Sequence, residues 1–326
     1  MPESDADNVK TVAALLAARL YYLQDLTMGA IAAELGTSRS SVSRLLSFAR
    51  DSGLVDIQIR SPFDRGIDLE QLIVAGHRVV AHVVPMPASI SDVDRLERVA
   101  MTAGRLFGRF IDSNMVVGVA WGSTLGAMSR HLVKKPTQNT TIVQMNGAGN
   151  TRTTGIDYAS EILHRFGEAF SAQVQQFPVP AFFDDPATRD ALWRERSTQR
   201  VLDMQTRMDL AVFGLGSPFA EVASQVYIGG YLDASDFRSL SDDGVVGDVA
   251  TVFYRADGTA DGVALNARAS GASLDRLRRV ARRVCIVSGV QKLPSLRGAL
   301  AAGLITDLVL DESLAVALVA ELAAPD

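Results

Sequence analysis

The sequence contains few of the residues that build metal sites or disulfide frameworks. Its 326 residues include one cysteine and four histidines. A single cysteine cannot form an intrachain disulfide, and Cys285 stands in the apolar run 284–287, so we expect a small buried hydrophobe. The histidines show no metal-ligand spacing and are expected to be surface or hydrogen-bonded groups: His77, His82, His131 and His164. We therefore expect no metal ion and no cofactor.

Long apolar runs are also absent. No run approaches the ~18 residues that cross a membrane, so we expect no membrane partner. The first ten residues are acidic and polar, unlike a signal peptide, which favours a cytoplasmic protein. The formal net charge of −5 excludes a general polyanion binder, and the length suggests two domains.

Residues 27–46 have the pattern of a helix-turn-helix. Thr27 and Ser38 are suitable N-caps for two short helices, and Gly36 suits a left-handed helix end between them. Ile31, Ala32 and Leu35 give the first helix an inward face. The second helix has apolar residues at positions i, i+3, i+4 and i+7: Val42, Leu45, Leu46 and Ala49. This spacing predicts a packed pair of helices that binds DNA.

The other face of the second helix carries hydroxyl and guanidinium groups, which suit phosphates and guanine edges. Residues 1–60 contain six basic and seven acidic residues, so DNA affinity must come from local placement. Between Gly36 and Arg50 there are three arginines and no acid. An ordinary helical hairpin with a solvated Ser/Arg face is the alternative. The predicted DNA-contacting residues are Thr27, Ser38, Arg39, Ser40, Ser41, Ser43, Arg44 and Ser47.

The segments on either side complete the predicted DNA-binding domain, residues 1–60. A helix over about 9–26, with an apolar row of Val12, Leu16, Leu20 and Leu23, would be the third member of the bundle. Residues 54–59 alternate apolar and polar, so we expect a strand that forms a small wing or leads out of the domain. Pro62 and Gly66 mark a linker at 61–67.

Residues 68–326 alternate between strand and helix patterns. Strands are predicted at 79–84, 115–121, 140–145, 210–213, 249–254, 284–287 and 307–310. Helices are predicted at 92–110, 123–132 and 156–170, and after each of the last two strands. This alternation predicts an α/β domain with a mainly parallel sheet behind the all-α N-terminal domain.

Four predicted strand-to-helix turns are rich in glycine or hydroxyl groups. Ligands of such sheets bind at the carboxyl ends of the strands, and N–H groups, hydroxyls and a lysine suit a phosphate. Tight turn geometry alone is the alternative for any one glycine. From these turns we take as candidate binding residues Gly122, Ser123, Thr124, Asn146, Gly147, Gly149, Gly214, Gly216, Ser217, Gln291 and Lys292.

Nearly the whole chain, in order, resembles the SorC family of bacterial sugar-binding transcriptional regulators, within the SorC/DeoR grouping. The resemblance is carried by LTMGAIAAELGTSRSSVSRLL, VVGVAWGSTLGAM, VQMNGAGN, AVFGLGS, VVGDVATVFYRADG and SGVQKLPSLRGAL. It implies a C-terminal domain related to sugar-phosphate isomerases and deaminases, which binds a sugar or phosphorylated sugar. It also implies double-stranded operator DNA as partner and a homodimer or homotetramer.

The resemblance assigns parts of the effector site. It puts a phosphate loop on Gly122, Ser123 and Thr124, and a second loop on 146–149, where AGN replaces a run of glycines. Asp248 matches the family's Gly-Asp pair, and Lys292 matches the basic residue that faces the effector.

These observations predict a transcriptional regulator of a carbohydrate-utilisation operon, controlled by its bound sugar. The alternative is a sugar-phosphate isomerase or deaminase with an added DNA-binding domain, in which Asp248 and Lys292 act as base and electrophile. No histidine stands in a predicted active-site loop, so we expect no enzyme and no catalytic residue. The sign of regulation and the identity of the sugar stay open.

Overall fold

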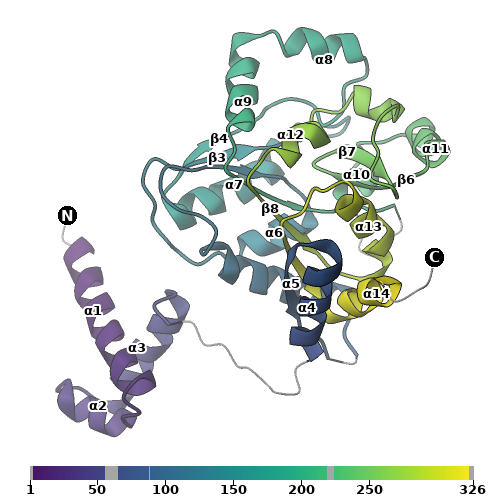
Figure 1. Cartoon of the computed structure of the whole chain (residues 1–326). Helices are drawn as coiled ribbons and strands as arrows, with labels where there is room; N and C mark the ends of the chain where they lie inside the picture. Colours follow the sequence, from purple (N-terminus) through teal and green to yellow (C-terminus); the bar gives the residue numbers. More distant parts are fainter. Residues whose placement is uncertain (1–2, 56–64, 88, 219–223, 323–326) are drawn as a thin grey trace. The chain divides into compact units, whose positions relative to one another are not determined.

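A computed structural model of the chain describes residues 3–55, 65–87, 89–218 and 224–322. It divides into two compact units, Met1–Pro62 and Phe63–Asp326 (Figure 1). The division lies within the expected linker, 61–67. Helix α4 (Arg65–His77) begins inside that range, so its last three residues are helical.

The N-terminal unit is a bundle of three helices, α1 (Glu3–Tyr22), α2 (Met28–Glu34) and α3 (Arg39–Asp51). Its small core joins residues from all three helices. The buried members are Ala14, Ala17, Ala18, Leu20, Ile31, Ala32, Val42, Leu46 and Ala49. Leu35 and Leu45, expected inside, are half-buried at its edge.

The predicted inward face of α1 is wrong. Of the expected row, Leu20 is buried, but Val12 is 64% exposed and Leu23 is 78% exposed. Ala14, Ala17 and Ala18 face the bundle instead, because small side chains let α1 lie close to its neighbours. The alanine row has the same helical period as the aliphatic row, so periodicity could not choose between them.

The strand expected at 54–59 lies mostly outside the described residues. Leu54 and Val55, its described part, are half-buried and do not form a strand.

The larger unit contains a seven-stranded sheet in the order β1-β9-β8-β5-β2-β3-β4. Every neighbouring pair is parallel, which confirms the predicted α/β class. The strands are β1 (Val80–Val84), β2 (Val116–Val119), β3 (Thr141–Gln144), β4 (Gln173–Gln175), β5 (Leu210–Gly214), β8 (Arg282–Val287) and β9 (Asp307–Asp311).

Helices cover both faces of this sheet. One face packs on α5 (Asp92–Phe107), α6 (Ser123–Ser129) and α7 (Ile156–Phe170). The other packs on α4, α9 (Arg196–Thr206), α12 (Leu274–Arg278), α13 (Leu293–Ala301) and α14 (Glu312–Leu322). Successive residues point to opposite faces: Val212 enters the first core and Phe213 the second. Cys285 is buried in the second, as expected.

A two-stranded hairpin lies outside the main sheet and corrects one prediction. The single strand expected at 249–254 is β6 (Val245–Val249) and β7 (Val252–Arg255), which pair antiparallel. Ala250 and Thr251 make the turn with φ values of +46° and +68°. Neither residue is the glycine or asparagine that usually marks such a turn. The sequence therefore gave no sign that residues 249–254 are interrupted by a turn.

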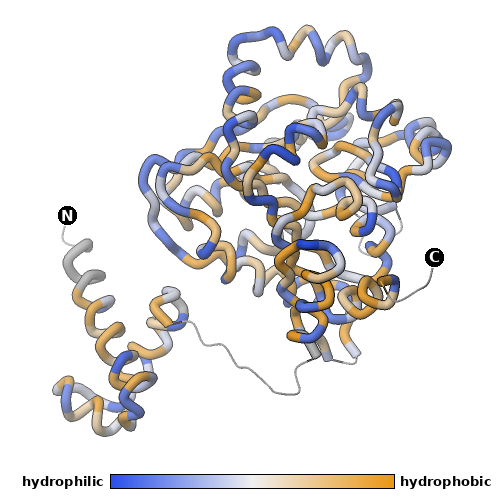
Figure 2. The backbone as a smooth tube through the Cα atoms, in the orientation of Figure 1, coloured by the Kyte–Doolittle hydropathy of each residue, from blue (hydrophilic) through white to orange (hydrophobic). Residues whose placement is uncertain are grey.

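The remaining helices are α8 (Pro186–Leu192), α10 (Gln225–Ile228) and α11 (Ala234–Asp242), with 3₁₀ turns at Ala264–Ala267 and Val290–Lys292. Figure 2 shows hydrophobic stretches concentrated in the interior elements and hydrophilic ones in α8 and α11. None of the helices in the described part of the chain is both long and apolar enough to span a membrane.

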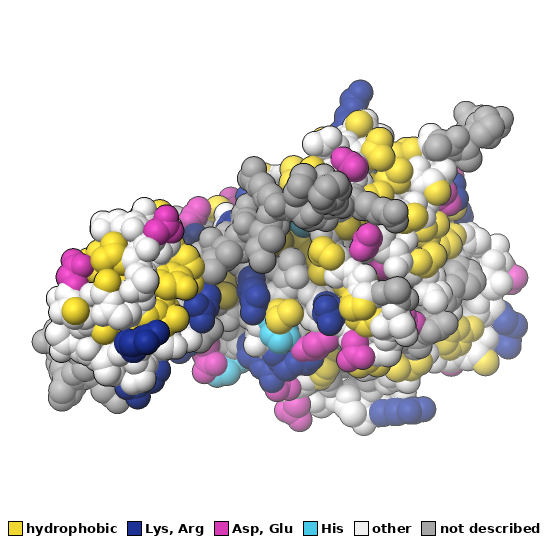
Figure 3. Space-filling model, turned by 90° about the horizontal axis from the view of Figure 1, so that it is seen from below, with side chains coloured by type: hydrophobic (Ala, Val, Ile, Leu, Met, Phe, Trp, Pro, Cys, Tyr) yellow, Lys and Arg dark blue, Asp and Glu magenta, His cyan; other side chains and the backbone are white. Residues whose placement is uncertain are grey.

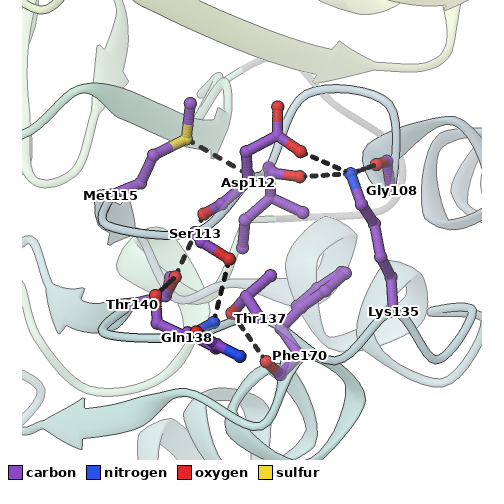
Figure 4. Close-up of polar contacts among 10 residues, drawn as sticks. Gly108, Asp112, Ser113, Met115, Lys135, Thr137, Gln138, Thr140 and Phe170 are labelled. Carbon is purple, nitrogen blue, oxygen red and sulfur yellow. Dashed lines mark hydrogen bonds and ion pairs between the residues drawn. The ribbon is translucent and has the colours of Figure 1, made fainter.

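The amino edge of the sheet is held by a polar network (Figure 4). Lys135 Nζ donates to the carbonyl oxygens of Gly108 and Ile111 at 2.8 and 2.6 Å, and to Asp112 at 2.8 Å. Thr137 Oγ1 donates to the carbonyl oxygen of Phe170 at 2.7 Å. These bonds fix the loops that enter β2 and β3. Lys135 therefore has a structural role, at the sheet edge opposite the predicted site.

The aromatic packing between α5 and α7 generates a stability prediction. Phe107 is fully buried, and its ring centroid lies 5.3 Å from that of Phe166 and 5.6 Å from that of Phe170. Phe107→Ala should lower the free energy of unfolding by about 3–5 kcal/mol, because it removes buried apolar area and leaves a cavity. Urea denaturation measures this, with the exposed Val316→Ala as control. A loss below about 1 kcal/mol would contradict the described core.

Candidate functional site

The helix-turn-helix begins both helices with side-chain caps. Thr27 Oγ1 accepts from the Ala30 N–H at 3.3 Å, and Ser38 Oγ accepts from the Ser41 N–H at 3.1 Å. Gly36 has φ of +60°, the left-handed conformation expected at the turn. Thr27 and Ser38, predicted as DNA contacts, thus have their hydroxyls in the caps, where they fix the start of each helix.

The outer face of α3 presents the other predicted residues. Arg39, Ser40, Ser43 and Arg44 are exposed, and Ser41 and Ser47 are half-buried. Arg44 donates to Ser41 Oγ at 3.3 Å, which orients its guanidinium along the helix.

Arg50 shares the outer face of α3 and was not among the predicted contacts. It donates to Tyr22 Oη at 3.0 Å and to Ser47 Oγ at 3.1 Å. Its position seven residues after Ser43, two helical turns on, was the available signal in the sequence.

At the carboxyl edge of the sheet, the predicted turns surround a small cavity of about 40 Å³. The turns after β2, β3 and β5 contribute, together with the hairpin and the start of α13. Eight of the twelve predicted effector residues line it: Gly122, Ser123, Thr124, Asn146, Gly214, Gly216, Asp248 and Lys292.

Four predicted residues do not line this cavity. The Gly147 N–H donates to Ser270 Oγ at 2.9 Å, and a side chain at Gly147 would collide with the Val179 backbone. Gly149 lines a neighbouring cleft. Ser217 is buried, with its N–H donating to Ser224 Oγ at 3.3 Å, and Gln291 is half-buried outside the cavity. Gly147 and Ser217 thus hold these turns through their backbone N–H groups.

Asp248 and Lys292 form the charged part of the cavity, and both are buried. The Lys292 ammonium donates to the Leu215 carbonyl oxygen at 2.8 Å. Burial lowers the pKa of Lys292, and the charge of Asp248 opposes that change. Burial raises the pKa of Asp248 to about 6, and the Tyr227 hydroxyl, the Thr251 N–H and the charge of Lys292 oppose that change.

Backbone contacts fix both charged residues. Asp248 and Gly216 exchange backbone hydrogen bonds of 2.9 and 3.3 Å, which tie the hairpin to the sheet edge. A Cβ on Gly216 would lie 1.7 Å from Asp248 Oδ1, so only glycine fits. On the other side, Asp311 Oδ2 accepts from the Gly289 N–H at 2.7 Å and holds the turn that leads to Lys292.

Two buried oxygens in the cavity lining lack a hydrogen-bond donor among the described residues: Asn146 Oδ1 and Asp248 Oδ1. A buried oxygen without a donor costs free energy, about 1–3 kcal/mol. The hydroxyls of Ser123 and Thr124 lie in the same lining, at the start of α6, which has no side-chain cap. The cavity therefore offers unpaired acceptors, hydroxyls and one ammonium to a polar molecule.

Several residues that line the cavity were not predicted from the sequence. Trp121 donates from Nε1 to the Gly147 carbonyl oxygen at 2.9 Å, and its ring stacks on Tyr231 with centroids 5.0 Å apart. Its place directly before Gly122 was the available signal. Thr251 and the segment 224–226 join through tertiary structure, and nothing in the sequence connects them with the turns.

A larger cleft of about 960 Å³ lies on the other side of this stack. Trp121 lines the small cavity, whereas Tyr231 lines the cleft together with Phe182 and Arg152. Tyr231 also donates to the Ala148 carbonyl oxygen at 3.1 Å, so the stack is bonded to the turn after β3.

The family model described as "Putative sugar-binding domain" matches residues 62–320. The chain is 29% identical over 319 residues to the deoxyribonucleoside regulator of Bacillus subtilis, covering 97% of this chain and 100% of that protein. It is 22% identical over 297 residues to the sorbitol operon regulator of Klebsiella pneumoniae, covering 91% and 93%. The chain belongs to the SorC family of sugar-binding transcriptional regulators.

Solved structures support this membership. A domain of "a possible sugar-binding transcriptional regulator from Arthrobacter aurescens TC1" is 54% identical, with a TM-score of 0.75, and covers 80% of this chain and 100% of that one. Full-length SorC from Klebsiella pneumoniae shares the fold at 22% identity, with a TM-score of 0.71 and 95% and 99% coverage. As a SorC-family member, the protein is a sugar-responsive regulator of transcription.

The raised pKa of Asp248 generates a pH prediction. The pKa is about 6 in the folded chain, against an ordinary 3.8, so protonated Asp248 contributes stability below about pH 4. That contribution is lost as the pH rises through 6. Between pH 4 and pH 7, the unfolding free energy of the parent protein should fall relative to Asp248→Asn by up to about 3 kcal/mol.

Urea denaturation across this pH range measures the difference. The exposed Asp242→Asn serves as control for the loss of a carboxylate. Parent and Asp248→Asn curves that run parallel from pH 4 to pH 7 would show that Asp248 does not titrate in this window.

Proposed function

We propose that the small cavity binds a sugar or sugar phosphate, and that this ligand controls operator binding by α3. The observation that carries the proposal is the pair of buried, unpaired oxygens beside a buried ammonium, Asn146 Oδ1, Asp248 Oδ1 and Lys292 Nζ. Sugar hydroxyls donate to such oxygens and accept from the ammonium. The named activities of the relatives from Bacillus and Klebsiella support this class of effector.

The chemistry around α6 supports an anionic group on the effector. Ser123 and Thr124 bring hydroxyls and uncapped N–H groups to the lining. Lys292 is the cation among the described lining residues. A phosphate at this point would accept from all three residues, and a charge-assisted bond is stronger than a neutral one.

The cavity's size supports regulation by movement. A cavity of about 40 Å³ has room for only a few waters, since about 10–15 Å³ of such volume holds one. A sugar therefore needs the walls to move, and the hairpin and the segment 224–226 are walls outside the main sheet. A ligand that binds the widened arrangement shifts the population toward it, and DNA and effector then change each other's affinity reciprocally.

Operator recognition is assigned to the exposed face of α3, with Arg39 and Arg44 as base or phosphate contacts. Two such helices on a homodimer or homotetramer would read a palindromic double-stranded operator. The protein would act in the cytoplasm, where such DNA lies.

We propose no catalytic role for Asp248 and Lys292. Both are held by the backbone of neighbouring segments, and the named relatives are regulators. Incubation with sugar phosphates should give binding without turnover.

The DNA assignment predicts the effect of removing both guanidinium groups. Arg39→Ala with Arg44→Ala should weaken binding by at least tenfold, because each lost contact costs about 1–3 kcal/mol. The probe is a duplex selected from a random library with the full-length protein, measured by fluorescence anisotropy at fixed salt. Arg98→Ala, which removes an exposed arginine from α5, should bind as the parent does. Unchanged affinity in the double variant would refute the assignment of this face.

The effector assignment is tested first by a thermal-shift screen of free sugars, polyols and their phosphates, since a ligand of the folded state raises its apparent stability. Calorimetry then compares the best phosphate with its neutral sugar. Lys292→Ala should weaken phosphate binding well beyond tenfold, since a charge-assisted bond contributes roughly 1.5–3 kcal/mol. It should scarcely change neutral-sugar binding.

The exposed Lys134→Ala is the matched control and should keep both affinities. If the unmodified protein binds the neutral sugar as tightly as the phosphate, the effector is unphosphorylated, and Asn146 and Asp248 become the principal contacts. If no carbohydrate or carbohydrate phosphate binds, the cavity is not the effector site.

A further inference from the structure

Helix α1 carries an apolar row on the side away from its own bundle. Val9, Val12, Leu16 and Leu23 are 71, 64, 44 and 78% exposed. The helix packs inward through Ala14, Ala17 and Ala18, which lie about half a turn away from this row. Figure 3 shows hydrophobic side chains gathered on the surface of the N-terminal unit, at the left of the view.

The spacing of the row is that of a seam between two helices. Positions 9, 12, 16, 19 and 23 alternate steps of three and four, the a and d positions of a heptad repeat. Arg19 occupies one of them and the other four are aliphatic. The Leu23 N–H donates to the Arg19 carbonyl oxygen at 3.0 Å, so the helical course continues to the end of the row. Such a row suits another helix of the same kind.

Charge selects the orientation of that second helix. In a parallel pair, Arg19 would face its own copy across the seam, and like charges repel. In an antiparallel pair centred between Val12 and Ala13, the two copies of Arg19 lie about 20 Å apart along the seam, so this repulsion is relieved. Val9 then lies level with Leu16 of the other helix, so aliphatic residues meet across the seam.

We propose that α1 is a homotypic contact, in which two copies of this chain pair antiparallel through Val9, Val12 and Leu16. The contact is isologous, as a two-fold dimer requires. Helix α3 packs on the alanine side of α1, so pairing leaves Arg39 and Arg44 exposed. The contact fixes the separation of two α3 helices within a dimer.

Cysteine cross-linking of the full-length protein tests the pairing. The native Cys285 is buried and burial raises the pKa of its thiol, so it adds little background. Val12→Cys places thiols beside the two-fold axis, and mild oxidation should give a disulfide-linked dimer at least tenfold faster than the control. The control is Glu34→Cys, exposed on α2 of the same unit.

Two further variants test the register. Leu23→Cys should cross-link no faster than the control, because the two copies lie about 30 Å apart in the antiparallel pair. The double variant Val9→Cys with Leu16→Cys should link rapidly, since these positions lie level across the seam.

Rapid linking of Leu23→Cys would overturn the antiparallel register. Control rates for both Val12→Cys and the double variant would overturn the homotypic contact. The experiment contains neither DNA nor sugar, so its failure leaves the proposed function of α3 and of the cavity unaffected.

Discussion

The bonding of the β6–β7 hairpin to the sheet edge is the interaction on which the proposed effector site depends. Asp248 and Gly216 exchange backbone hydrogen bonds, and the absence of a side chain at Gly216 lets the carboxylate lie against the turn after β5. Without this contact Asp248 would not be buried beside Lys292. The shifted pKa values of both groups follow from the same burial.

The two edges of the parallel sheet differ in how their polar groups are bonded. Its amino edge is fixed by Lys135 and the loops that enter β2 and β3, where the ammonium has three oxygen partners. At the carboxyl edge, buried oxygens of Asn146 and Asp248 lack donors among the described residues. The Lys135 ammonium is thus satisfied at the amino edge, whereas the oxygens of Asn146 and Asp248 at the carboxyl edge have no donor, and ligands of parallel sheets generally bind at that edge.

The two units bury their apolar side chains to different extents. The larger one covers both faces of its sheet with helices and buries large aromatic residues such as Phe107 and Phe213. The N-terminal unit has a small core rich in alanine, and α1 leaves its larger aliphatic side chains outside. Small domains bury a smaller share of their surface, so the proposed pairing of two copies would add apolar burial that such a bundle lacks alone.

The sequence by itself determined the parts of the protein that rest on local spacing. The caps at Thr27 and Ser38 follow from short-range pattern, because each depends on residues close in the chain. The alternation of strands and helices favours a parallel sheet, and the turns that follow parallel strands share one edge. Tertiary structure alone decided which of two apolar rows of α1 is buried, since both have the same period. It also decided that Asp248 lies on a separate hairpin and that Thr251 lines the cavity, because these contacts join segments far apart in sequence.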